Sequence, residues 1–103
     1  MNVIPTAGDG VLFINIFTVR PENQQALIDC MREGAPTDMP GLISAKLLRS
    51  RDGTKVINHM LWESQEAFAQ ATRTDPAIAA TRHRVHELIE GAAPDAYEII
   101  DVK

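Results

Sequence analysis

The sequence predicts an α+β domain of the ferredoxin-like class, in which helices cover one face of a four-stranded antiparallel sheet. Its apolar segments follow the order strand, helix, strand, strand, helix pair, strand, which is the split βαβ arrangement. An Asp-Gly turn signal at positions 52 and 53 predicts a hairpin. At 103 residues the chain has the length of one domain, which we expect over residues 11–103. Residues 1–10 end in small and polar residues, and we expect them to be a flexible N-terminus.

The first strand is predicted over residues 11–20, where Val, Ile and Phe recur on both faces. Asn15 interrupts the inward set that it forms with Phe13 and Phe17. The proline that follows this strand suits the first turn of a helix. Apolar residues then repeat at helical spacing until Gly34, so the strand is expected to pass directly into a helix.

The second strand is predicted over residues 41–51 and the third over residues 55–63. Side chains alternate along a strand. One face of the third strand therefore carries Val56, Asn58, Met60 and Trp62, and the other carries Ile57, His59, Leu61 and Glu63. Both faces are largely apolar, which is typical of a strand buried on both sides.

A short helix is predicted over residues 64–73, with Ser64 as its N-cap. An Asp-Pro pair starts a longer helix over residues 75–90, and Gly91 is expected to end it. The last strand is predicted over residues 95–103, because apolar and polar side chains alternate there.

The first three strands carry apolar residues on both sides, although the helices can cover only one face of the sheet. The economical cover for the second face is another copy of the same sheet, packed by two-fold symmetry. We therefore expect a homodimer built sheet against sheet, with His59 at its interface.

Polar side chains on the helix-covered side need a reason, because a buried polar group without a partner costs about 1–3 kcal/mol. One stripe of the long helix is formed by Ile78, Arg82, Val85 and Ile89. Arg82 either extends outward or pairs with an acidic neighbour, or it guards a pocket together with Asn15 and Asn58 and faces an anionic ligand.

Trp62 shares a strand face with Asn58, about 13 Å away along the strand, which leaves room for a flat molecule of several rings. A buried indole N–H needs a partner, so a cavity with polar ends is the functional interpretation. Ordinary core packing of Trp62 is the alternative. The apolar lining of the cavity would come from Phe13, Phe17, Met60 and Phe68.

The net charge is −4 and the sequence has no basic run, so it offers no positively charged segment that would bind nucleic acid or an anionic membrane. No apolar run reaches the length of a membrane span, and neither partner is expected. The first ten residues do not resemble a secretion signal, and Cys30 has no partner for an intrachain disulfide. We therefore expect a cytoplasmic protein.

Metal and nucleotide cofactors are not predicted. His83, His86 and Glu87 have a spacing that suits a metal, but His83 and Glu87 project away from the apolar stripe, so a solvated helix face is the better interpretation. The sequence lacks the glycine-rich signatures for nucleotides and the common nucleophile motifs. Cys30 is better explained as packing.

Four segments carry a resemblance to a known family: I-N-I-F-T-V-R-P-E-N from Ile14, P-G-L-I-S-A from Pro40, D-G-T-K-V-I-N-H-M-L-W-E-S from Asp52, and Y-E-I-I-D-V from Tyr97. Together they resemble the antibiotic biosynthesis monooxygenase domain family of dimeric α+β barrel proteins, which includes small cofactor-independent anthrone oxygenases. The resemblance extends over residues 12–102. The Asn58 and Trp62 pair is its most specific part.

In the oxygenases that this sequence resembles, the pocket residues match Asn15, Asn58, Trp62 and Arg82. The resemblance implies a homodimeric, cofactor-independent monooxygenase that oxidises an anthrone-type polycyclic phenol to a quinone with O2. Phe68 stands where some of these oxygenases have a tyrosine. Haem-degrading relatives have a haem-ligating histidine soon after the tryptophan, and this chain lacks it, so haem is not expected.

Two other functions are consistent with the sequence. One is oxidation of a smaller quinol at the same site, and the other is a dimer that binds an aromatic or quinone-like ligand without catalysis. Oxygen uptake separates them from each other, because a binder shifts the absorbance of its ligand without consuming oxygen.

Overall fold

The structure, a computed structural model, describes residues 10–34, 39–74 and 76–103, so nearly all of the predicted N-terminal segment lies outside the described residues. The described elements, in chain order, are β1 (Val11–Val19), the 3-10 helix η1 (Pro21–Asn23), α1 (Gln24–Glu33), β2 (Leu42–Arg49), β3 (Lys55–Trp62), α2 (Gln65–Thr74), α3 (Pro76–Leu88) and β4 (Ile89–Tyr97).

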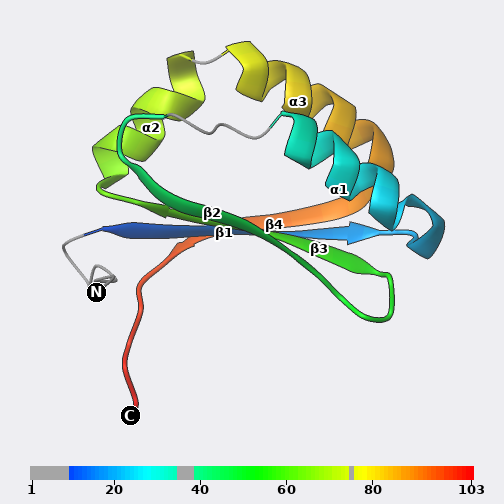
Figure 1. Cartoon of the computed structure of the whole chain (residues 1–103), viewed down its shortest axis with the longest axis horizontal. Coiled ribbons are helices and arrows are strands. Elements are labelled where there is room, and N and C mark those ends of the chain that lie inside the picture. Colours follow the sequence, from blue (N-terminus) through cyan, green and yellow to red (C-terminus); the bar gives the residue numbers. More distant parts are fainter. Residues whose placement is uncertain (1–9, 35–38, 75) are drawn as a thin grey trace.

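The four strands form one antiparallel sheet in the order β2-β3-β1-β4. Figure 1 shows the helices on one face of this sheet, while the opposite face carries none of the helices that the structure describes. The predicted ferredoxin-like α+β class is therefore confirmed. Within the described residues, no helix combines the length and the apolar character that crossing a membrane requires.

Local signals in the sequence account for most of the boundaries. The Ser64 Oγ accepts a hydrogen bond of 3.0 Å from the Ala67 N–H, which is the expected cap of α2. In the hairpin between β2 and β3, Gly53 adopts a positive φ of 84°, a conformation that glycine adopts without steric cost. The predicted hairpin is confirmed.

The register of the two central strands defines the face that the helices cover. Phe13 pairs with Met60, and Asn15 pairs with Asn58. Directly opposed residues of an antiparallel pair point to the same side. Val56 and Trp62 on this side of β3 are 0% exposed, so the inward face predicted for the third strand is confirmed.

Two clusters of buried side chains fill the space between helices and sheet. The larger one lies under α1 and α3 and consists of Phe17, Val19, Leu27, Ile28, Cys30, Met31, Val56 and Val85. The smaller one lies under α2 and consists of Met60, Trp62 and Ala71. Cys30 is thus a packing residue, as predicted. Each fully buried large side chain contributes about 1.5–3 kcal/mol. Members of both clusters also line the cavity described below.

The last helix and the last strand differ from the sequence prediction. α3 ends at Leu88, and β4 begins at once and includes Gly91 and Pro94. β4 is an edge strand paired only with β1, and a proline is tolerated at such an edge because one side needs no N–H donor. β4 ends at Tyr97, opposite Leu12, so β1 offers almost no further residue with which the segment after Tyr97 can pair.

Candidate functional site

A cavity of about 900 Å³ is lined by residues of the sheet and of α1, α2 and α3. It is within the size range of sites for small organic ligands. All eight residues that the sequence analysis selected line this one cavity: Phe13, Asn15, Phe17, Asn58, Met60, Trp62, Phe68 and Arg82. The structure therefore brings the selected residues together, whereas their chemical roles stay predictions.

The two asparagines meet at the centre of the sheet. Asn15 of β1 and Asn58 of β3 are directly opposed on neighbouring strands, which puts their Cβ atoms about 5 Å apart. The Asn58 Nδ2 contacts the Met60 Sδ at 3.5 Å, and sulfur is a weak acceptor. A ligand oxygen at this position would be a stronger partner for the Asn58 amide than the thioether.

Two buried polar atoms of the cavity wall lack a partner among the described residues. They are the Asn15 Oδ1, an acceptor, and the Trp62 Nε1, a donor. Leaving such a group unpaired in a protein interior costs about 1–3 kcal/mol. A ligand that carries both a hydroxyl and a carbonyl or ionised oxygen would satisfy both atoms.

Aromatic rings form the apolar wall beside these polar groups. The Phe68 ring lies 4.7 Å from the Phe13 ring and 5.8 Å from the Trp62 ring, measured between centroids, with Trp62 in an edge-to-face arrangement. Such pairs contribute about 0.5–1.5 kcal/mol each beyond their burial. Phe68 therefore holds the indole of Trp62 in a fixed orientation, and its phenyl ring has no hydroxyl to offer a substrate.

Arg82 combines two of the alternatives that the sequence left open, because it extends outward and also borders the cavity. Its residue is exposed while it also lines the cavity, so it lies at the open side of the cavity, and Val85 occupies the buried centre of the helix stripe. Among the described residues no hydrogen bond or ion pair engages Arg82. The aliphatic part of the side chain is long and flexible, so it can turn the planar guanidinium toward an anionic ligand.

His86 is a cavity residue that the sequence analysis did not select. Its spacing of four residues from Arg82 could have identified it, because residues i and i+4 share a helix face. His83 and Glu87 behave as predicted for a solvated face: their side chains are 80% and 68% exposed, and the His83 Nε2 lies 3.3 Å from the Glu87 Oε1.

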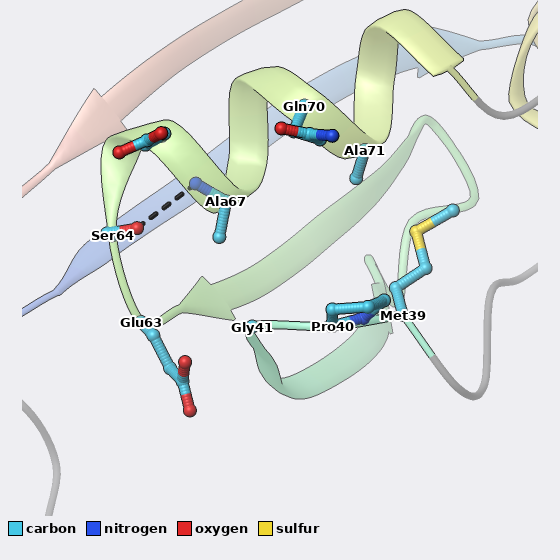
Figure 2. Close-up of a pocket in the computed structure, with 9 residues that line it drawn as sticks. Met39, Pro40, Gly41, Glu63, Ser64, Ala67, Gln70 and Ala71 are labelled. Carbon is cyan, nitrogen blue, oxygen red and sulfur yellow. Dashed lines mark hydrogen bonds between the residues drawn. The ribbon is translucent and has the colours of Figure 1, made fainter.

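A smaller pocket of about 500 Å³ lies beside α2, between this helix and the turn before β2. Figure 2 shows Gly41 next to Ala67 on its wall and Glu63 turned away from the helix. Ser64, which also lines it, already accepts the capping hydrogen bond from α2. The large cavity, with its unpaired buried atoms, is therefore the better candidate site.

Comparisons with known proteins identify the family of this chain. The pattern of the family described as "Antibiotic biosynthesis monooxygenase" matches residues 11–83. Tetracenomycin-F1 monooxygenase of Streptomyces glaucescens is 36% identical over 81 residues, which cover 76% of this chain and 71% of that protein.

Solved structures of other proteins share the fold of this chain. A monooxygenase from the ActVA-Orf6 gene of Streptomyces coelicolor, in complex with nanaomycin D, is 27% identical with a TM-score of 0.81, over 91% of this chain and 90% of that chain. The fold is also shared with SnoaB, a cofactor-independent oxygenase from Streptomyces nogalater, at 23% identity and a TM-score of 0.72 over 92% and 97% of the two chains. The chain therefore belongs to the antibiotic biosynthesis monooxygenase family and is a monooxygenase.

Proposed function

We propose that the protein is a cofactor-independent monooxygenase that oxidises an electron-rich polycyclic phenol of the anthrone type to a quinone with O2. The observation that carries this proposal is the pair of unpartnered buried atoms, the Asn15 Oδ1 and the Trp62 Nε1, on the wall of a largely apolar cavity of about 900 Å³. Such a wall suits a flat ring system with oxygens at defined positions. The names of the relatives, a tetracenomycin-F1 monooxygenase and a cofactor-independent oxygenase, support the same reading.

The chemistry needs no resident electron carrier, because an electron-rich phenol can itself reduce dioxygen once it is deprotonated. Asn58 and Asn15 would hydrogen-bond the carbonyl or enolate oxygens, and Arg82 would stabilise the developing negative charge. Trp62 would orient the ring and the oxygen adduct through its face and its N–H. The aromatic wall would keep water away from the adduct.

Three variants test these roles: Asn58→Ala, Trp62→Phe and Arg82→Gln, each assayed by oxygen uptake with a dihydroxyanthrone under air. Removing one donor to a developing oxyanion lowers kcat by about 10²–10³-fold in enzymes, so we expect kcat/KM to fall by at least about tenfold in each variant. Arg84→Gln is the matched control, because Arg84 lies on the same helix but pairs with the Glu33 Oε2 at 2.9 Å and does not line the cavity.

Full activity in all three variants would remove these assignments.

The two alternative functions would give different results in the same assay. A non-catalytic binder would change the absorbance of the anthrone without oxygen uptake, and a quinol monooxygenase would consume oxygen faster with a single-ring quinol than with the tricyclic substrate.

We also propose that the sheet face opposite the helices pairs with a second copy of the chain. Leu48 and Tyr97 on this face are 46% and 43% exposed, and Ile43 at the edge strand is 45% exposed. The His59 Nδ1 on the same face is buried without a partner among the described residues. An apolar sheet face of this kind marks an association surface, and a self-complementary two-fold contact would cover it.

A further inference from the structure

The oxygenation proposed above begins with the loss of a proton from the substrate, and none of the four assigned residues can accept one. Amides and indoles are not bases near neutral pH, and a guanidinium stays protonated. A side chain that accepts this proton must therefore come from elsewhere on the cavity wall. This inference rests on the proposed function and concerns the same site.

His86 is placed to fill this role. It follows Arg82 by one helical turn on α3, and both side chains line the cavity. The adjacent Val85 is buried in the core, which fixes the inward side of this turn. The His86 residue is exposed, so its imidazole can exchange a proton with bulk water after each turnover.

We propose that His86 is the general base of this oxygenase. Among the described residues that line the cavity, none is an aspartate, a glutamate, a tyrosine or a cysteine. Histidine is the side chain whose protonation ordinarily changes between about pH 5 and 8, and it is the commonest proton acceptor in enzymes. The imidazole of His86 is thus the available base among these residues.

The remaining charges around the cavity suit this step. Arg82 on α3 and Arg32 on α1 line the same cavity, and their positive charges would stabilise the anion that proton transfer leaves. Lys46 also borders the cavity, but it pairs with His59 on the opposite face, so its side chain points away. Glu90, near His86 in sequence, faces Arg20 at 3.7 Å.

The proton balance closes with one base. His86 accepts a proton from the methylene carbon of the anthrone, the resulting carbanion transfers an electron pair to O2 and forms a C–O bond, and the protonated imidazole returns its proton to the terminal oxygen. Loss of the second C–H proton to His86 and cleavage of the O–O bond then give the quinone carbonyl and hydroxide. The imidazolium protonates the hydroxide to water, so one O2 and two C–H hydrogens yield one carbonyl oxygen and one water.

The test compares His86→Gln with wild type by oxygen uptake with a dihydroxyanthrone across pH 5 to about 9, the range that brackets histidine titration. We expect kcat/KM at neutral pH to fall by about 10²–10⁴-fold and the acid limb of the wild-type profile to disappear. Imidazole added to His86→Ala should restore part of the rate. His83→Gln, which alters an exposed histidine outside the cavity, should match wild type.

A second readout does not depend on turnover. Under nitrogen the anthrone is not oxidised, so exchange of its methylene hydrogens with D2O, followed by NMR, reports proton abstraction from the methylene carbon. This exchange should be faster with wild type than with His86→Gln. Equal exchange rates with the two proteins, or a His86→Gln oxidation rate within about threefold of wild type with an unchanged pH profile, overturns the assignment of His86. Absence of oxygen uptake by wild type, together with faster methylene exchange in wild type than in His86→Gln, overturns the proposed function but supports His86 as a base.

Discussion

Burial of the Trp62 indole N–H lowers the stability of the protein without a bound ligand. Its side chain is fully buried while its indole N–H has no partner among the described residues, a penalty of about 1–3 kcal/mol. Packing against Phe68 in an edge-to-face contact holds the ring in place despite this penalty. Buried polar groups left unpaired in this way are rare in native proteins, and a bound ligand would supply the missing partner.

Asp52 is the residue whose ionisation is most strongly perturbed in the described chain. Its pKa falls from 3.8 to about 2 because its carboxylate accepts hydrogen bonds from the side chain and backbone of Thr54 and from Ser50. The unfolded chain takes up this proton at a higher pH than the folded chain does. The stability that the ionised carboxylate contributes is therefore present above about pH 4 and lost as the pH falls toward 2.

We predict that Asp52→Asn removes this part of the pH dependence of stability. Urea unfolding of wild type and variant should show a difference in the free energy of unfolding that shrinks from about pH 4 to pH 2. Asp101→Asn, a change in the exposed C-terminal segment, serves as the control. A difference between wild type and Asp52→Asn that stays constant over this range would contradict the assignment.

Gly41, in the loop before β2, packs directly against α2. It adopts a positive φ of 85°, its carbonyl accepts a hydrogen bond of 2.7 Å from the Glu63 N–H, and a Cβ at this position would overlap the Cβ of Ala67. A left-handed backbone costs a non-glycine residue about 1–2 kcal/mol. The close approach of this turn to α2 thus depends on the missing side chain.

Gly41→Ala should therefore lower the free energy of unfolding by about 2 kcal/mol or more, measured by urea denaturation. Gly91→Ala is the matched control. Gly91 has no positive φ, and a Cβ there would meet no atom within 4 Å, so the free energy of unfolding should stay equal or rise by about 0.5 kcal/mol. Equal stabilities of the two variants would show that the Gly41 conformation carries no such constraint.

β4 shows how pairing overrides local preference. Its first half contains Gly91, Ala92 and Ala93, residues with weak strand preference, whereas the segment after Tyr97 alternates apolar and polar side chains. β1 nevertheless pairs with residues 89–97, because a strand forms where a partner backbone supplies its hydrogen bonds. Ile100 and Val102, without such a partner, are exposed.

For the whole molecule, the proposed dimer gives a direct prediction. Leu48→Glu places a charge on the exposed, apolar sheet face, where it costs little in a monomer but would be buried between two copies. The variant should weaken dimerisation by about a hundredfold or more, roughly 2.7 kcal/mol, and sediment as a monomer of 11.3 kDa.

The control for this experiment is Ala80→Glu, which adds the same charge to the exposed side of α3 and should leave the association unchanged. Sedimentation equilibrium at several protein concentrations measures both variants and wild type. Wild type that sediments as a monomer, or a Leu48→Glu dimer of unaltered affinity, would contradict the proposed sheet-to-sheet contact.

Local periodicity and turn chemistry by themselves determined the element order, the hairpin, the cap at Ser64 and the inward face of β3 with Asn58 and Trp62, since each depends on residues close in sequence. Only the tertiary structure decided the position of β4, the exposure of Arg82 and the entry of His86 into the cavity wall. The physical reason is that strand pairing and the rotation of a helix about its axis depend on contacts between distant segments. A stripe of residues on α3 shows which side chains lie together, whereas the packing of Val85 between α1 and the sheet sets how far that stripe turns inward.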